Sequence, residues 1–80
     1  MNIKEKVYKV ISETLSIDPS IINEDLEVGG IKEWDSLGQV NLIVSLEKEF
    51  ELTFDVDETL EMDNVFDIVD ILEQRFKEDE

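Results

Sequence analysis

Hydrophobic residues recur at helical spacing over the first fifteen positions of the chain. They are Ile3, Val7, Val10, Ile11 and Leu15, and each lies three or four residues from another of the set. Such spacing places them on one side of a helix, and Lys4, Lys6 and Lys9 fall outside that stripe. Asn2 followed by Glu5 is a plausible capping pair at the start. The pattern predicts an amphipathic helix over residues 3–15.

Residues 16–35 form a long connection. Asp18-Pro19 is a helix-start or turn signal, and Gly29-Gly30 breaks any regular element. Apolar residues nevertheless recur through the segment: Ile21, Ile22, Leu26, Val28 and Ile31. Structureless connections longer than about 12–15 residues are uncommon unless they are functional or held in place. We expect this loop to pack on the core and to fix where the next helix begins.

A second helix is predicted from Ser36 to about Phe50. The residues expected on its broad buried face are Leu37, Val40, Ile43, Val44, Leu46 and Phe50. Those expected mostly on the opposite side are Gly38, Gln39, Asn41, Ser45, Lys48 and Glu49.

The last third of the chain predicts a short helical turn near Glu58–Met62 and a final helix from about Asn64 to Phe76. The inward residues of the final helix are Val65, Ile68, Val69, Leu72 and Phe76, and Asp63 or Asn64 can cap it. Strand signals are weak. The expected fold is all-α: one domain over residues 1–80, a bundle of three longer helices plus one short helix, packed antiparallel.

Composition narrows the possible chemistry. The chain has 80 residues, of which 41% are hydrophobic, and it contains no cysteine and no histidine. Disulfides and thiolate metal sites are therefore excluded, and the commonest general base is missing. There is no long apolar run, and the first residues do not resemble a secretory signal. A cytoplasmic protein is expected.

The net charge of −15 also constrains the partners. Nucleic acid is an unsuitable partner because phosphate binding rests on Lys and Arg, and anionic membrane surfaces are disfavoured for the same reason. Residues 1–34 hold four basic and seven acidic side chains, while residues 35–80 hold three and fifteen. This acidity serves solubility, and it also suits encounters with basic patches on other proteins. Such a charge favours a monomer.

The segment Trp34-Asp35-Ser36-Leu37 places a lone serine at the first turn of the second predicted helix. A nucleophilic serine needs a base and a group that orients it, and no histidine exists to act as that base. Paired-carboxylate catalysis needs a cleft that so small a chain can hardly form. We therefore expect no catalytic residue, and we interpret Ser36 as an attachment point.

Asp55, Asp57 and Thr59 occupy alternate positions, as the first ligands of a calcium-binding loop do. Such a loop requires glycine at the next position and a glutamate at its end, where the chain has Leu60 and Phe66. The motif fails, and no specific metal site is predicted. Loose binding of divalent cations by clustered carboxylates stays open, as a general property of acidic proteins.

Asp35-Ser36-Leu37 opening a helix, the long preceding loop and the Leu-Glu-Lys-Glu-Phe stretch at 46–50 resemble an acyl carrier protein. The similarity covers essentially the whole acidic chain. The resemblance implies that Ser36 carries 4′-phosphopantetheine, which a phosphopantetheinyl transferase transfers from coenzyme A. The thiol of this group would hold acyl groups as thioesters. Asp35 and Leu37 would be flanking recognition residues. The other implied partners are acyl-loading and acyl-processing enzymes with basic docking patches.

In that family an acyl chain can lie between the helices. The resemblance then makes six residues candidate lining residues, although plain core packing is the alternative for each: Val40, Ile43, Val44, Leu46, Leu60 and Met62. Trp34 is interpreted as an anchor that packs the end of the loop against the bundle, or else as a residue that contacts the phosphopantetheine.

Three positions depart from the usual pattern of fatty-acid carriers. Those proteins usually have an acid directly after Asp-Ser-Leu and another three positions further on, where this chain has Gly38 and Asn41. Trp34 also replaces a small residue. These departures favour a specialised lipid, polyketide, aminoacyl or glycan pathway over housekeeping fatty-acid synthesis.

The alternative from another class is an acidic helical interaction domain, such as an inhibitor or adaptor, with no prosthetic group. Ser36 would then be an ordinary first-turn residue and Asp35 only a helix cap. Glu47 and Glu49 are either partner contacts or solvated side chains under both hypotheses.

Overall fold

The structure is a computed structural model that describes residues 2–78, with side chains over residues 2–76. Its elements in chain order are α1 (Ile3–Leu15), the 3₁₀ turn η1 (Pro19–Ile21), α2 (Ser36–Phe50), α3 (Val56–Glu61) and α4 (Val65–Glu78). The predicted bounds of the first two longer helices are confirmed. The short helix begins two residues before its predicted start, and the last helix ends two residues beyond its predicted end.

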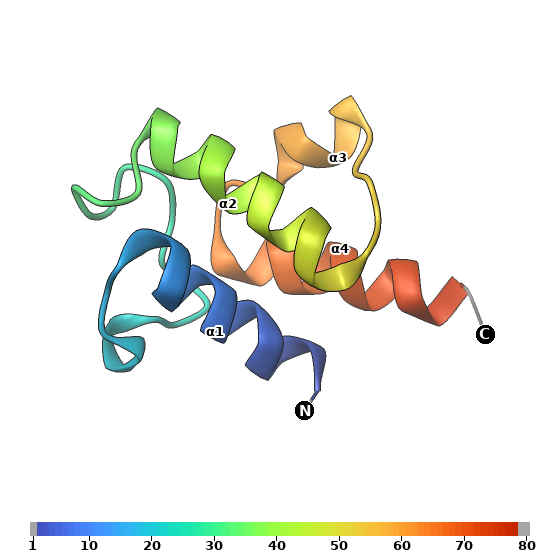
Figure 1. Ribbon diagram of the computed structural model, residues 1–80, viewed down its shortest axis with the longest axis horizontal. Coiled ribbons are helices and arrows are strands. Elements are labelled where there is room, and N and C mark those ends of the chain that lie inside the picture. The colour runs from blue at the N-terminus through green and yellow to red at the C-terminus, as the bar shows by residue number, and fades with distance from the viewer. Residues whose placement is uncertain (1, 79–80) are drawn as a thin grey trace.

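The helices form a bundle in which α1 packs against both α2 and α4, and α3 packs against α4 (Figure 1). In Figure 1, α1 runs opposite to α2 and α4, while α2 and α4 run in roughly the same direction, so the bundle is not antiparallel throughout. The all-α class with three longer helices and one short helix is confirmed for residues 2–78.

One hydrophobic cluster fills the interior. Its largest fully buried side chains come from α1, the end of the long loop, α2, the α3–α4 connection and α4: Trp34, Ile11, Leu42, Leu46, Met62, Ile68, Leu72, Val7 and Val65. The predicted inward face of the last helix is confirmed, with Val69 and Phe76 partly buried. Burial of these side chains is the main favourable term in the stability of a domain this small.

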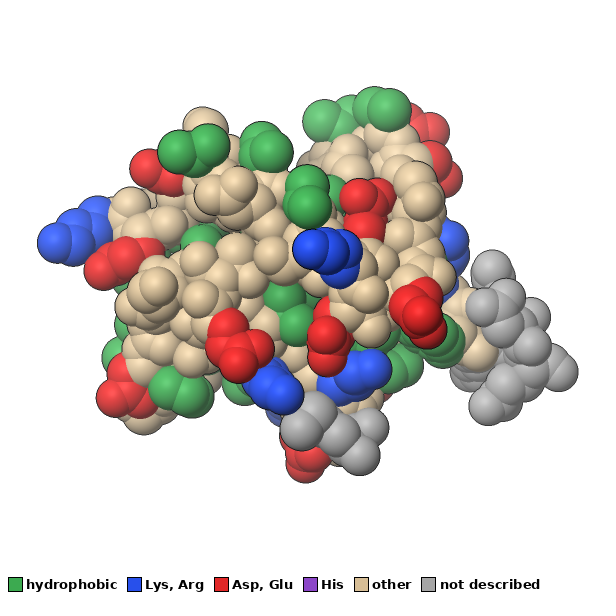
Figure 2. Space-filling model, in the orientation of Figure 1, with side chains coloured by type: hydrophobic (Ala, Val, Ile, Leu, Met, Phe, Trp, Pro, Cys, Tyr) green, Lys and Arg blue, Asp and Glu red, His purple; other side chains and the backbone are tan. Residues whose placement is uncertain are grey.

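The predicted buried face of α2 is partly wrong. The residues that α2 buries are spaced by four, and they are Gly38, Leu42, Leu46 and Phe50. Leu37, Val40 and Val44 are instead 68%, 58% and 51% exposed. Hydrophobic side chains accordingly lie on the surface over α2 and over α3, along the upper edge of the molecule in Figure 2.

The rotation of α2 about its axis has a local cause at Gly38. A Cβ atom on this residue would lie 2.6 Å from the carbonyl oxygen of Glu33 and 3.2 Å from Cδ2 of Leu15. The missing side chain therefore allows the first turn of α2 to approach α1 and the loop closely. This contact turns Gly38 inward, and Leu37 outward with it.

The long loop packs on the core, as expected, and it is also hydrogen-bonded to the start of α4. Three backbone hydrogen bonds join the two segments. The Val28 N–H donates to the Asp63 carbonyl oxygen at 2.9 Å. The Val65 N–H donates to that of Leu26 at 3.0 Å, and the Phe66 N–H to that of Glu24 at 3.1 Å. Ile22 is buried and Leu26, Val28 and Ile31 are partly buried. Ile21 is 46% exposed, against the prediction, because it lies in the outward η1 turn.

Side-chain caps fix the starts of the helices. Oδ1 of Asn2 accepts a hydrogen bond from the Glu5 N–H at 2.8 Å, which confirms the predicted cap of α1. Asp18 accepts from the Ser20 N–H, and this backbone hydrogen bond lowers the pKa of the exposed Asp18 carboxyl below its usual value. Asn64 caps α4 by accepting from the Asp67 N–H at 2.8 Å.

The short helix α3 is tied to α4. Asp55 and Glu58 form a capping box at its start. Arg75 donates to Oε1 of Glu58 at 2.6 Å and to the carbonyl oxygen of Thr53 at 3.2 Å. Because this pair is only partly buried, it fixes the position of α3 more than it adds stability.

Between residues 2 and 78, no helix combines the length and the apolar character needed to cross a membrane. Among the side chains that the structure describes, those of residues 2–76, no three Asp, Glu, His or Cys side chains come together in a way that could hold a metal ion.

Candidate functional site

Trp34 anchors the end of the loop that leads to α2. Its side chain is fully buried. The indole Nε1–H donates to Oε1 of Gln39 at 2.7 Å, and Nε2 of Gln39 donates to the Met62 carbonyl oxygen at 2.6 Å. The interpretation of Trp34 as an anchor is confirmed. Gln39, predicted on the outer side of the helix, links the loop end to the α3–α4 connection.

The backbone on the N-terminal side of Trp34 is closed on itself. The Gly29 N–H donates to the Trp34 carbonyl oxygen at 2.7 Å, and the Trp34 N–H donates to the Ile31 carbonyl oxygen at 3.2 Å. Gly29 has a φ of 84°, a left-handed conformation that glycine adopts at little cost. The glycine pair seen in the sequence thus makes the turn that delivers Trp34 and the residues after it.

Asp35 is the N-cap of α2. Its Oδ1 accepts a hydrogen bond from the Gly38 N–H at 2.8 Å, and its carbonyl oxygen accepts from the Gln39 N–H at 2.9 Å. Two backbone donors at the helix start are satisfied by one residue. The capping role expected of Asp35 is therefore confirmed, and it defines Ser36 as the first helical residue.

Ser36 and Leu37 both lie on the surface, at the first turn of α2. The first turn contains no acidic side chain. The start of a helix in general favours a phosphate group, although here the Asp35 carboxylate already accepts from the Gly38 N–H. An exposed hydroxyl here can therefore bear a phosphodiester without burying its charge. The prediction that Leu37 packs in the core is wrong, because the inward position is taken by Gly38.

The six residues that could line an acyl chain do not share one location. Leu46 and Met62 are fully buried in the core, and Ile43 is partly buried. Val40, Val44 and Leu60 are exposed, the last of them by 75%. Core packing accounts for the first two, and the surface residues need another explanation.

The two glutamates near the end of α2 differ in role. Oε2 of Glu47 accepts a hydrogen bond from the Phe54 N–H at 2.9 Å, so this carboxylate holds the connection to α3. Glu49 is exposed. Glu47 therefore has a structural role that its sequence context did not indicate.

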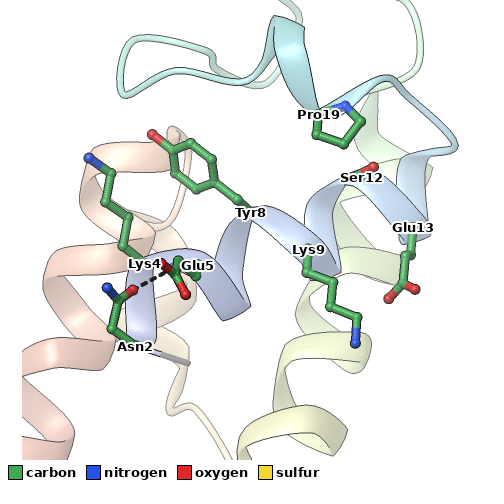
Figure 3. Close-up of a pocket in the computed structure, with 8 residues that line it drawn as sticks. All are labelled: Asn2, Lys4, Glu5, Tyr8, Lys9, Ser12, Glu13 and Pro19. Carbon is green, nitrogen blue, oxygen red and sulfur yellow. Dashed lines mark hydrogen bonds between the residues drawn. The ribbon is translucent and has the colours of Figure 1, made fainter.

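A hollow of about 750 Å³ lies on the outer face of α1, beside the η1 turn (Figure 3). It is lined by Asn2, Lys4, Glu5, Tyr8, Lys9, Ser12, Glu13 and Pro19. Ser12 is already engaged, because its hydroxyl donates to the Ile17 carbonyl oxygen at 2.7 Å. The hollow includes no residue of the Asp35–Leu37 segment, and we do not assign it to the site.

Comparison with known proteins places the chain among carriers. It is 44% identical over 59 residues to the D-alanyl carrier protein of Streptococcus mutans, and this aligned region covers 72% of each chain. It is 32% identical over 71 residues to the acyl carrier protein of Guillardia theta, covering 89% of this chain and 88% of the relative. No protein-family model matches.

The fold has a counterpart among solved structures. The solution structure of the holo acyl carrier protein from Geobacter metallireducens superposes with a TM-score of 0.83. The superposition covers 99% of this chain and 91% of the other, at 25% sequence identity.

Proposed function

This chain belongs to the acyl carrier protein family, and we propose that Ser36 is the residue that carries its 4′-phosphopantetheine. The chain is thus a carrier and not an enzyme. The prosthetic group of such carriers supplies a thiol on a flexible arm, where acyl groups are held as thioesters. One observation carries the proposal: Ser36 is an exposed hydroxyl at the start of α2, with a cap supplied by its neighbour.

The residues around Ser36 have different roles in placing its hydroxyl at the surface. Trp34 fixes the loop end in the core, and Asp35 caps the helix with its side chain. Leu37 extends into solvent next to Ser36, where a modifying enzyme can contact it. A flexible arm attached at a rigid point on the protein presents its bound group to each partner at a high effective concentration. Asp35 and Leu37 are therefore proposed as the flanking recognition residues.

The pathway is proposed to be specialised. Gly38 and Asn41 stand where fatty-acid carriers usually have acids, and Trp34 replaces a small residue. The similarity to a D-alanyl carrier protein supports clients other than ordinary fatty acids. Lipid, polyketide, aminoacyl and glycan routes all fit these features.

The proposed partners are a phosphopantetheinyl transferase and the enzymes that load and process the acyl group. The acidic surface of this chain supports the proposal that those enzymes bind it through basic patches. A monomeric state fits the net charge of −15, because like charges repel. A cytoplasmic location stays a prediction.

Incubation of the purified chain with coenzyme A and a broad-specificity phosphopantetheinyl transferase tests this function. We expect the intact mass to rise by a single phosphopantetheine. An unchanged mass, with a known carrier modified in the same mixture, would favour the alternative of an acidic interaction domain.

A further inference from the structure

The side chain of Gln39 joins three parts of the fold beside Ser36. Its Oε1 accepts from the Trp34 indole Nε1–H at 2.7 Å, and its Nε2 donates to the Met62 carbonyl oxygen at 2.6 Å. We call this pair of hydrogen bonds the Gln39 bridge. Ser36 and Gln39 are three residues apart on α2, so their side chains are neighbours on the helix surface. The Gln39 bridge therefore lies at the edge of the interior, next to the proposed attachment site.

The two groups that Gln39 pairs have no access to water. Trp34 and Met62 are both fully buried. An indole N–H can only donate and a backbone carbonyl can only accept, so the amide oxygen and the amide nitrogen of Gln39 are both needed. A group that entered between α2 and the α3–α4 connection would displace this amide and leave both partners unpaired. Because unpaired buried polar groups are costly, the Gln39 bridge opposes such an entry.

The space behind the Gln39 bridge is occupied by side chains of the chain itself. Leu42 and Leu46 of α2 are fully buried there. The short helix α3 buries no residue, and its two hydrophobic residues, Val56 and Leu60, are 73% and 75% exposed. Hydrophobic side chains over α3 accordingly lie on the surface in Figure 2. The helix α3 therefore provides no inward apolar wall against which an alkyl chain could lie.

We propose that the Gln39 bridge closes the interior to the group carried on Ser36, so that this carrier holds short or polar acyl groups, which stay outside the bundle. This inference rests on the proposed role of Ser36. A long alkyl chain kept in water exposes apolar surface, which is unfavourable. A short acyl group, or one with a polar substituent such as an amine, has little apolar surface to bury. Gln39 is then a residue that determines specificity for the length of the cargo.

The transferase, supplied with acetyl- or octanoyl-coenzyme A, can load the chain with a short or a long acyl group for the test. We expect the melting temperatures of the two loaded forms to differ by less than about 3 °C. Burial of even one methylene of the longer chain would raise the melting temperature of so small a domain by several degrees. A larger rise in the octanoyl form would therefore overturn the inference, because it would show that the cargo is buried.

The indole N–H signal in the NMR spectrum reports on the Gln39 bridge itself. The chain has one tryptophan, so this signal belongs to Trp34. Its position should coincide in the acetyl and octanoyl forms, because the hydrogen bond to Gln39 is kept in both. A signal that moves when the longer chain is attached would overturn the inference.

Gln39→Ala removes the Gln39 bridge and shortens the side chain next to Ser36. In this variant we expect the octanoyl form to melt more than about 3 °C above the acetyl form, because the interior is now open to the chain. Gln74→Ala is the matched control: it removes the other glutamine, which is exposed on α4 and bonded to Asp70. Gln74→Ala should behave as the wild type does.

A smaller difference between the two forms of Gln39→Ala would overturn the role of Gln39 as the barrier. If that variant does not fold, the wild-type melting temperatures and the Trp34 signal decide the proposal without it. Intact mass confirms that each form is loaded. If neither coenzyme A thioester modifies the wild type, the proposed function fails, and this result is distinct from a failure of the closed interior.

Discussion

The Ser36→Ala variant is expected to gain no phosphopantetheine under conditions that modify the wild type completely. The hydroxyl oxygen of Ser36 is the atom that would be esterified, so removing it leaves the transferase nothing to modify at this position. Intact-mass spectrometry after incubation with coenzyme A and the transferase measures the effect directly.

Ser45→Ala provides the matched control, because Ser45 lies on the same helix and loses the same atom. It should be modified as fully as the wild type. The cap of α2 belongs to Asp35, so Ser36→Ala should change the free energy of unfolding by no more than about 0.5 kcal/mol. A modified Ser36→Ala variant would show that another residue is the attachment site.

Trp34→Ala is expected to destabilise the fold more than any other single change near the site. Removing a fully buried tryptophan costs about 3–5 kcal/mol, and a domain of this size is stable by about 4–12 kcal/mol. The variant also loses the hydrogen bond from the indole to Gln39. We expect a large drop in the urea concentration at the midpoint of unfolding, followed by circular dichroism.

Two further variants separate the causes of this loss. Trp34→Phe keeps an aromatic ring but removes the indole donor, so we expect a loss of about 1 kcal/mol from the unpaired Gln39 oxygen, plus the packing lost with the smaller ring. Phe66→Ala removes an aromatic side chain that is 55% exposed, and it should have a small effect. An unfolding midpoint for Trp34→Ala equal to that of the wild type would refute the role of Trp34 as the anchor.

The sequence was sufficient to predict where the two long N-terminal helices begin and end. Asn2 and Asp35 are capping residues whose side chains act within three positions, so their effect is local and visible in the pattern. The position of Asp35-Ser36-Leu37 at the start of a helix was also predictable, because the segment follows a long loop. These features depend on neighbours in the sequence.

The direction that α2 faces could not be predicted from its own residues. Apolar side chains occur almost all around the helix between Leu37 and Leu46, so periodicity alone does not choose a side. The choice depends on the close contact of Gly38 with Glu33 and Leu15, which is a tertiary contact. A glycine inside a predicted helix was the available hint, since it often marks close packing.

The bridge made by Gln39 was equally invisible in the sequence. Its partners are Trp34, five residues earlier, and Met62, twenty-three residues later. Only the folded arrangement of the loop, α2 and the α3–α4 connection brings these groups together. The same holds for Glu47, whose carboxylate binds the backbone of Phe54 across the turn after α2.

The most direct test of the central claim is tandem mass spectrometry of this protein isolated from the cells that naturally make it. The chain offers five serines as possible sites: Ser12, Ser16, Ser20, Ser36 and Ser45. We predict phosphopantetheine on the peptide that contains Ser36, with the other four serines unmodified. A native protein with an unmodified Ser36, or with the group on a different serine, would contradict the assignment of Ser36 as the attachment site.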